Sequence, residues 1–166
     1  SLQPRTVRCE MTSEPRPGVH QFGLIFDEAA WPLLYVRFPS KPLSDEGFEH
    51  FIARYTAMVE RRIPFATILD SRGLSTAITA QQRKRLTEWF DVTGDLAGEH
   101  HFGIAVLMSN PIIRGALKAV TWVKPIPVPI HPFGSIAEAA PWLRSVLAER
   151  NIPVNEAMES ILSNRG

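Results

Sequence analysis

Three consecutive basic residues, Arg83, Lys84 and Arg85, are the first candidates for chemistry in this sequence. They fall in the first two turns of a predicted helix that begins after Thr79, where each cation opposes the helix dipole by roughly a few tenths of a kcal/mol. Together with Arg72 in the preceding loop, these residues indicate a site for an anion or an acidic partner. The site would lie at a helix N-terminus, next to the carboxyl ends of the parallel strands. The alternative is a solvated helix face, because Arg and Lys are good helix formers.

An apolar, proline-rich segment from Trp122 to Phe133 is the second candidate. Trp122, Pro127 and Pro129 would form a surface for an unknown protein partner, or the lip of an apolar pocket. The alternative is that Trp122 and Phe133 belong to the core, while the prolines protect a sheet edge from aggregation. If this segment is a strand, its prolines place it at an edge, because they cannot donate ladder hydrogen bonds.

The sequence predicts no catalytic centre, metal site or cofactor. Ser71 and Ser75 lack the G-x-S-x-G elbow of a hydrolase, so a hydrolase or transferase built on the Asp70 to Thr79 loop is the least favoured interpretation. His100 and His101 are adjacent, so their side chains diverge, and no H-x-x-x-H or H-E-x-x-H spacing gives them a shared face. We expect them in a solvent-exposed loop before a strand. Phosphate-binding glycine motifs are also absent from the sequence.

Composition places the chain among ordinary globular domains. Its 166 residues are 45% hydrophobic and 21% charged, and a chain of this size buries roughly 69% of its unfolded surface around one core. The 18 basic and 17 acidic residues give a net charge of +1, so no overall field attracts nucleic acid or an anionic membrane. Cys9 is the only cysteine, which excludes an internal disulfide. With no signal peptide and no apolar run of ~20 residues, we expect a cytoplasmic protein without a membrane span.

Hydrophobic periodicity and turn residues predict alternating strands and helices. Two early strands joined by a short turn imply an antiparallel hairpin. The predicted elements, in chain order, are strands at 20–26 and 33–38, a helix at 45–62, a strand at 65–69, a helix at 80–98, a strand at 102–108, a helix at 111–124, a strand at 126–130, a helix at 136–150 and a weak amphipathic piece at 154–162.

Local signals set several of these boundaries. Thr79 with Gln82 forms a capping box at the start of one helix, and Ser135 with Glu138 forms a second box further along. Pro141 lies inside the helix that follows Ser135, where it removes a backbone hydrogen bond and should bend the axis.

The sum of these elements is an α/β fold with a single mixed, mostly parallel sheet of about five strands and four main helices. Residues 1–18 form a flexible arm, residues 19–151 the domain, and residues 152–166 a tail with a short amphipathic helix. The predicted core consists of Phe51, Ile52, Tyr55, Leu69, Leu86, Trp89, Ile104, Val106, Leu107, Leu117, Trp142 and Leu143.

The C-terminal tail could dock on its own domain or on a second copy of the chain. Its piece from Val154 to Leu162 is too short to be a stable helix by itself, so its apolar side must dock or the piece stays disordered. Docking on its own domain is the simpler outcome. Docking on a second copy would bury the tail together with the proline-rich edge. Small α/β domains with an exposed edge often pair as two-fold dimers, so we favour a homodimer.

Several strings, in their order and spacing, resemble the SpoIIAA-like, or STAS-like, domain superfamily and in particular its uncharacterised bacterial branch. The resemblance covers about His20 to Asn151, and no single motif in it is diagnostic. The strings are WPLLYVRFPS, FATILDSRG, QQRKRLTEWF, GALKAVTWVKPIPVPIHPF and the S-x-x-E-A-x-x-WL run at Ser135 to Leu143.

The resemblance implies a regulatory or binding module rather than an enzyme. In the anti-sigma-factor antagonists of that group, phosphorylation of a serine in a D-S-[ST]-G string at the start of the second helix acts as a switch. Here the string Asp70-Ser71-Arg72-Gly73 imitates the motif but follows the strand directly. By element position the switch falls near Thr79 and Ala80, so an alanine stands where the serine would be.

We therefore expect a non-enzymatic regulatory or scaffolding module that acts through protein–protein contacts. The alternative is a carrier or sensor of a small apolar ligand, as in the related architecture of CRAL-TRIO lipid-transfer domains. A closed core favours the first function, and an apolar cavity on the order of several hundred Å³ favours the second.

Overall fold

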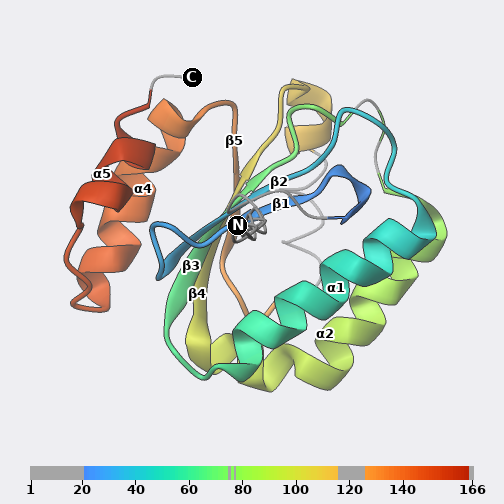
Figure 1. The fold of residues 1–166 in the computed structure, drawn as a ribbon, viewed down its shortest axis with the longest axis horizontal. Coiled ribbons are helices and arrows are strands. Elements are labelled where there is room, and N and C mark those ends of the chain that lie inside the picture. The colour runs from blue at the N-terminus through green and yellow to red at the C-terminus, as the bar shows by residue number, and fades with distance from the viewer. Residues whose placement is uncertain (1–20, 75, 77, 116–125, 165–166) are drawn as a thin grey trace, which may run out of the picture.

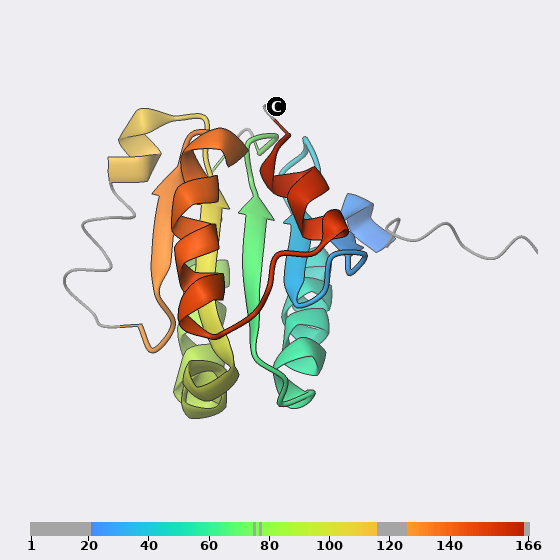
Figure 2. The same cartoon turned by 90° about the vertical axis from the view of Figure 1, so that its left-hand side faces the viewer.

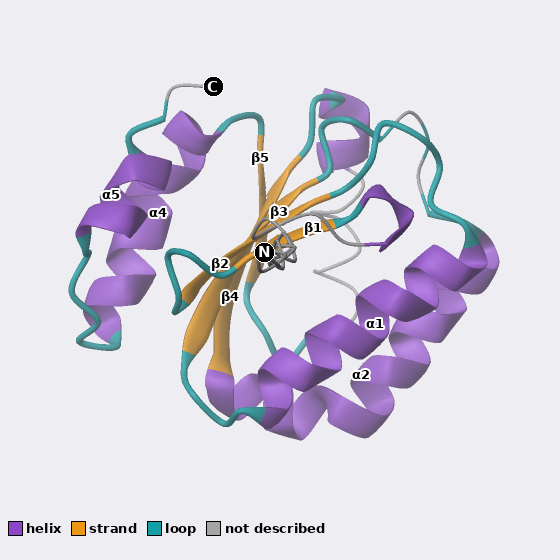
Figure 3. Cartoon of the chain, in the orientation of Figure 1, coloured by secondary structure: helices purple, strands orange, loops and turns teal. Residues whose placement is uncertain are grey.

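A five-stranded sheet forms the centre of the molecule, with helices on both of its faces (Figures 1 and 3). The computed structural model describes residues 21–74, 76, 78–115 and 126–164. Strand β1 runs antiparallel to β2, and the other neighbouring strands are parallel, which confirms the predicted mixed α/β sheet. The strands follow one another across the sheet as β1 (Ile25–Asp27), β2 (Leu33–Arg37), β3 (Phe65–Asp70), β4 (His101–Leu107) and β5 (Ile130–Phe133).

Two helical layers cover the sheet (Figure 2). Helices α1 (Asp45–Glu60) and α2 (Ala80–His100) lie on one face, and α4 (Ile136–Glu149) and α5 (Glu156–Leu162) lie on the other. Right-handed crossovers from β2 to β3 and from β3 to β4 move in the same direction across the sheet, so α1 and α2 share a face. Each layer packs on the sheet through its own hydrophobic cluster.

Strand β2 shows why the sheet is apolar on both sides. Leu34 and Val36 are fully buried in the cluster beneath α1 and α2, while Leu33 is fully buried in the cluster beneath α4 and α5. Successive side chains of a strand point to opposite faces, so a strand covered on both faces needs apolar residues at nearly every position.

The C-terminal tail docks on its own domain. Met158 and Leu162 of α5 are buried in the cluster beneath α4, and Arg144 of α4 donates two hydrogen bonds to the Glu159 carboxylate, the shorter at 2.7 Å. This is the simpler of the two outcomes expected for the tail. Because α5 is covered by its own chain, the tail no longer argues for a homodimer.

The first predicted strand is shorter than expected. Residues Gln21–Gly23 form a turn of 3-10 helix, and the strand β1 begins only at Ile25. Phe22 has a φ of 64° and Gly23 a φ of 73°, so the chain bends here and cannot continue the alternation of the strand. Phe22 is consequently 41% exposed.

The proline-rich strand predicted at 126–130 is displaced, because β5 spans Ile130–Phe133. The preceding segment instead packs beside α2, where a Cβ on Gly94 would lie 3.2 Å from Pro127 and Val128 is 1% exposed. β5 is an edge strand, as expected, and Pro132 is the proline that protects it. Since the carbonyls of Pro129 and Phe133 bond to β4, alternation turns Pro132 toward the free edge.

Most of the predicted core is confirmed. Leu69, Leu86, Val106 and Trp142 are only partly buried, and Leu117 lies outside the described residues. The fully enclosed members of the predicted set are Phe51, Ile52, Tyr55, Trp89, Ile104, Leu107 and Leu143.

Two predicted helix signals differ in detail. Helix α2 runs through Gly98 and ends at His100, since that glycine lies against Pro127 inside the packed layer. At the start of α4, Ser135 Oγ accepts a hydrogen bond from the Glu138 N–H at 3.2 Å. The Glu138 carboxylate, however, accepts from the Gly134 N–H at 2.8 Å, so the reciprocal bond of the capping box is made one residue early.

Replacing Gly103 by Ala should lower the free energy of unfolding by about 1–3 kcal/mol, because β4 lies close to α4 at this point. The register between β3 and β4 shifts at Phe65 and Ala66, and a Cβ on Gly103 would lie 3.0 Å from Trp142 Cη2. The matched control is Gly115→Ala, where a Cβ meets no described atom within 4 Å. Chemical denaturation measures both variants, and equal losses would contradict this account.

Candidate functional site

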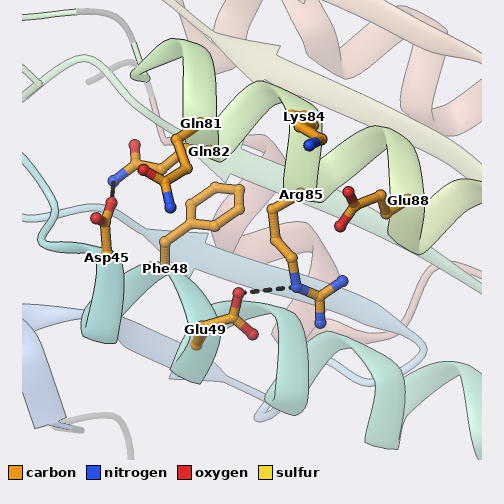
Figure 4. A pocket seen from close by; sticks show the side chains of 8 residues that line it. All are labelled: Asp45, Phe48, Glu49, Gln81, Gln82, Lys84, Arg85 and Glu88. Atoms are coloured by element: carbon orange, nitrogen blue, oxygen red, sulfur yellow. Dashed lines mark hydrogen bonds and ion pairs between the residues drawn. The ribbon is translucent and has the colours of Figure 1, made fainter.

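A groove open to solvent lies between the first turns of α1 and α2 (Figure 4). Its volume is about 260 Å³, which is below the range of roughly 300–1,000 Å³ typical of small-molecule pockets. The buried ring of Phe48 supplies an apolar base, and most of the other lining side chains are charged. The lining residues are Asp45, Phe48, Glu49, Gln81, Gln82, Lys84, Arg85 and Glu88.

Gln82 joins the two helix ends that form the groove. Its Oε1 accepts a hydrogen bond from the Thr79 N–H at 3.2 Å, and Thr79 Oγ1 accepts from the Gln82 N–H at 3.1 Å, which confirms the predicted capping box. Its Nε2 donates to the Leu43 carbonyl at 2.9 Å and to Asp45 Oδ1 at 3.1 Å. Gln82 is 4% exposed, so these bonds replace the water that its amide has lost.

The α1 wall of the groove is acidic, and the α2 wall carries charges of both signs. On the α1 side lie Asp45 and Glu49, and on the α2 side lie Lys84, Arg85 and the acidic Glu88. Arg85 Nε donates to Glu49 Oε1 at 2.8 Å and bridges the walls. Both partners are more than a third exposed, so the pair contributes at most about 1 kcal/mol and can exchange partners. This arrangement suits a polypeptide with charges of both signs better than a simple anion.

The residues of the predicted anion site have separate roles in the structure. Arg72 donates from Nε and Nη2 to the two carboxylate oxygens of Asp70, each at 2.9 Å. Arg83 Nη1 donates to the Ile78 carbonyl at 2.9 Å, and the hydroxyl of Thr79 caps α2. Of this set, Lys84 lines the groove. Anion binding stays a prediction.

Asp70, at the carboxyl end of β3, anchors the loop that leads to α2. Besides Arg72, Tyr35 Oη donates to Asp70 Oδ2 at 2.6 Å. Burial acts to raise the pKa of Asp70, but the hydrogen bonds from Arg72 and Tyr35 outweigh it and hold that pKa below its ordinary value. Burial and the bond to Asp70 raise the pKa of Tyr35 to about 12. Ser71 Oγ donates to the Leu107 carbonyl at 2.7 Å, which assigns this serine a structural role.

The predicted proline surface is described in part. Pro127 and Pro129 are exposed on either side of the buried Val128, and Trp122 lies outside the described residues. Their use as a partner surface stays a prediction.

The expectation of a solvent-exposed loop at His100 and His101 is wrong. Helix α2 ends at His100 and β4 begins at His101, so no loop separates them. His101 is 1% exposed, and its ring stacks on Phe65 with centroids 4.3 Å apart. Nothing in the sequence indicated that His101 is buried, because two adjacent histidines look equally polar although only His101 faces the sheet.

A chain of buried hydrogen bonds links His101 to α1 and β3. Tyr55 Oη donates to Thr67 Oγ1 at 2.8 Å, and His101 Nε2 lies 3.0 Å from Thr67 Oγ1 and 3.2 Å from Tyr55 Oη. Burial lowers the pKa of His101 to about 3 and raises the pKa of Tyr55. Both side chains are therefore neutral near pH 7. Enclosed in the core, they hold elements together and have no route to a substrate.

Sequence reasoning missed the acidic wall of the groove and the role of Gln82 as a link between helices. The capping boxes and N-caps mark where α1 and α2 begin, but they do not show that the two starts lie side by side. Among the described residues, no group of three or more His, Cys, Asp or Glu side chains is placed to hold a metal ion.

Comparisons with protein-family models, with curated proteins and with solved structures found no match for this chain. None of the helices in the described part of the chain has the length and apolar character that crossing a membrane requires.

Replacing Gln82 by Ala should lower the free energy of unfolding by about 1–3 kcal/mol, because it removes half of the capping box and leaves the Leu43 carbonyl without its amide donor. The control is Gln81→Ala, an exposed neighbour on the same groove, where the change should stay within about 0.5 kcal/mol. Urea denaturation compares the two. Equal stability of the two variants would show that the hydrogen bonds of the Gln82 side chain do not stabilise the fold.

Lowering the pH should destabilise the wild type more steeply than His101→Gln. Above about pH 6.5 the imidazole is neutral in both states, but between that value and about 3 only the unfolded chain binds the proton. As the pH is lowered through this range, the free energy of unfolding therefore decreases by up to about 1.4 kcal/mol per pH unit because of His101. The control is His131→Gln on the exposed side of β5. Denaturation midpoints across this pH range test the slopes, and identical slopes in all three proteins would contradict the assignment.

Proposed function

We propose that this chain is a non-enzymatic regulatory or scaffolding module that acts through protein–protein contacts. The observation that carries the proposal is the groove between α1 and α2, which has Asp45 and Glu49 on one wall, Lys84, Arg85 and Glu88 on the other, and the buried ring of Phe48 at its base. Charged side chains of both signs, grouped so that a partner can meet them with complementary charges, are features of protein recognition surfaces.

The packing of the core supports this function over that of an apolar carrier. Both faces of the sheet are filled by hydrophobic clusters. One hollow among the described residues is the charged groove, and another is an open depression on α4 and the segment after it, near Ile152 and Val154. Neither lies between a helical layer and the sheet, where a carrier would enclose its ligand.

The order of elements supports a module of STAS-like type. The resemblance rests on several strings and on the order of the predicted elements, and the described elements follow that order, with a hairpin before alternating helices and parallel strands. In this proposal the partner contacts the chain around the start of α2, with Lys84 and Glu49 as direct contacts.

Affinity capture from a lysate of the source organism tests the proposal, with the purified chain as bait. Glu49→Arg and Lys84→Glu each reverse one charge on a groove wall, so both variants should lose the proteins that the wild type retains. Glu149→Lys, on α4 at the opposite layer, is the matched charge reversal and should retain them.

The same captured set in all four baits, or no protein above the empty matrix, would overturn the proposal. Melting temperatures of the three variants show that the losses do not come from unfolding, because exposed substitutions of this kind change stability little.

A further inference from the structure

One ion pair lies across the groove between α1 and α2 (Figure 4). Arg85 Nε, on α2, donates to Glu49 Oε1, on α1, at 2.8 Å, and both side chains line the hollow. The two side chains are 36% and 53% exposed, so water competes for both charges and the pair opens at little cost. A contact that spans a recognition groove and opens easily can be exchanged for a contact with a partner.

The two members of this pair have different neighbours on their own helices. Glu88 follows Arg85 by three residues on α2 and also lines the groove, so Arg85 has a second carboxylate within reach. Glu49 has no Lys or Arg within four residues on α1, and the residues four and three positions before it are Asp45 and Glu46. Without Arg85, Glu49 would therefore stand among carboxylates and need a cation from outside the chain.

We propose that the ion pair between Arg85 and Glu49 is an autoinhibitory contact, which a basic side chain of the partner displaces. In this exchange the ammonium or guanidinium group of the partner pairs with Glu49, while Arg85 turns to Glu88 on its own helix. An acidic side chain that took Arg85 would instead leave Glu49 without a counter-ion. The inference rests on the proposed function, because it concerns the same groove, and it adds that the partner segment carries Lys or Arg.

The fold does not need this ion pair to keep the groove in place. Gln82 joins the same two helix starts through buried hydrogen bonds to the Leu43 carbonyl and to Asp45, so the walls stay together when the exposed pair opens. If the pair were only a tie between α1 and α2, removing Arg85 would not improve the binding of a basic segment. If it is autoinhibitory, removing Arg85 should improve that binding.

The fluorescence anisotropy of a labelled hexa-arginine peptide measures the exchange at low salt. Arg85→Gln should bind this peptide about two- to fivefold more tightly than Arg83→Gln, which is the range expected for the loss of one exposed ion pair. Arg83→Gln is the matched control, because it removes the same charge from the same helix, and Arg83 donates to the Ile78 carbonyl and does not line the groove. Added salt should reduce the difference between the two variants.

A double-mutant cycle assigns the gain to Glu49. In a Glu49→Gln background, Arg85→Gln should bind hexa-arginine no more tightly than Arg83→Gln, because the carboxylate that Arg85 covers is gone. Circular dichroism establishes that each variant is folded, which we expect because none of the three side chains is buried.

Equal affinity of Arg85→Gln and Arg83→Gln for the peptide, or a gain that persists without Glu49, would overturn the autoinhibitory contact. A peptide that binds none of the proteins would also overturn it, since no basic segment then enters the groove. The proposed function fails on a separate result, which is the capture of the same lysate proteins by the wild type and by Glu49→Arg.

Discussion

The side-chain amide of Gln82 is the interaction on which the candidate site depends. It closes the N-terminal cap of α2 through Thr79 and at the same time bonds to Leu43 and Asp45 at the start of α1. A buried amide without partners costs more than its bonds contribute, so all of these groups must stay in place together. The starts of α1 and α2 are thus held side by side, and the charged side chains of the next turn become the two walls of a groove.

Buried polar groups also determine how the rest of that layer is assembled. The chain of bonds from Tyr55 through Thr67 to His101 ties α1, β3 and β4 beneath α2. Asp70, at the end of β3, holds Tyr35 and Arg72 and so fixes the start of the loop that leads to α2. Apolar packing alone allows a helix to shift over a sheet, whereas each of these hydrogen bonds forms only within a narrow range of distance and angle and therefore fixes the position of the helix.

The candidate site lies on the exposed surface of α1 and α2. Ser71, which lies in the loop of the least favoured hydrolase interpretation, donates to the Leu107 carbonyl, and His101 is neutral and enclosed. The exposed charged side chains of the groove, among them Glu49 and Lys84, are the groups that we propose a partner contacts. Complementary charges give specificity and orientation to an encounter between proteins, which is the function proposed here.

The sequence by itself determined the elements and their order, because periodicity, caps and turn residues act over a few residues. The Thr79 and Gln82 box, the hairpin and the edge position of the last strand follow from such local signals. Only the tertiary structure decided that His101 is buried, that the proline-rich segment packs beside α2 before the strand begins, and that Gln82 reaches Asp45, 37 residues away. These outcomes depend on which elements become neighbours across the sheet, and that choice is made by the packing of the whole chain and not by any short stretch of it.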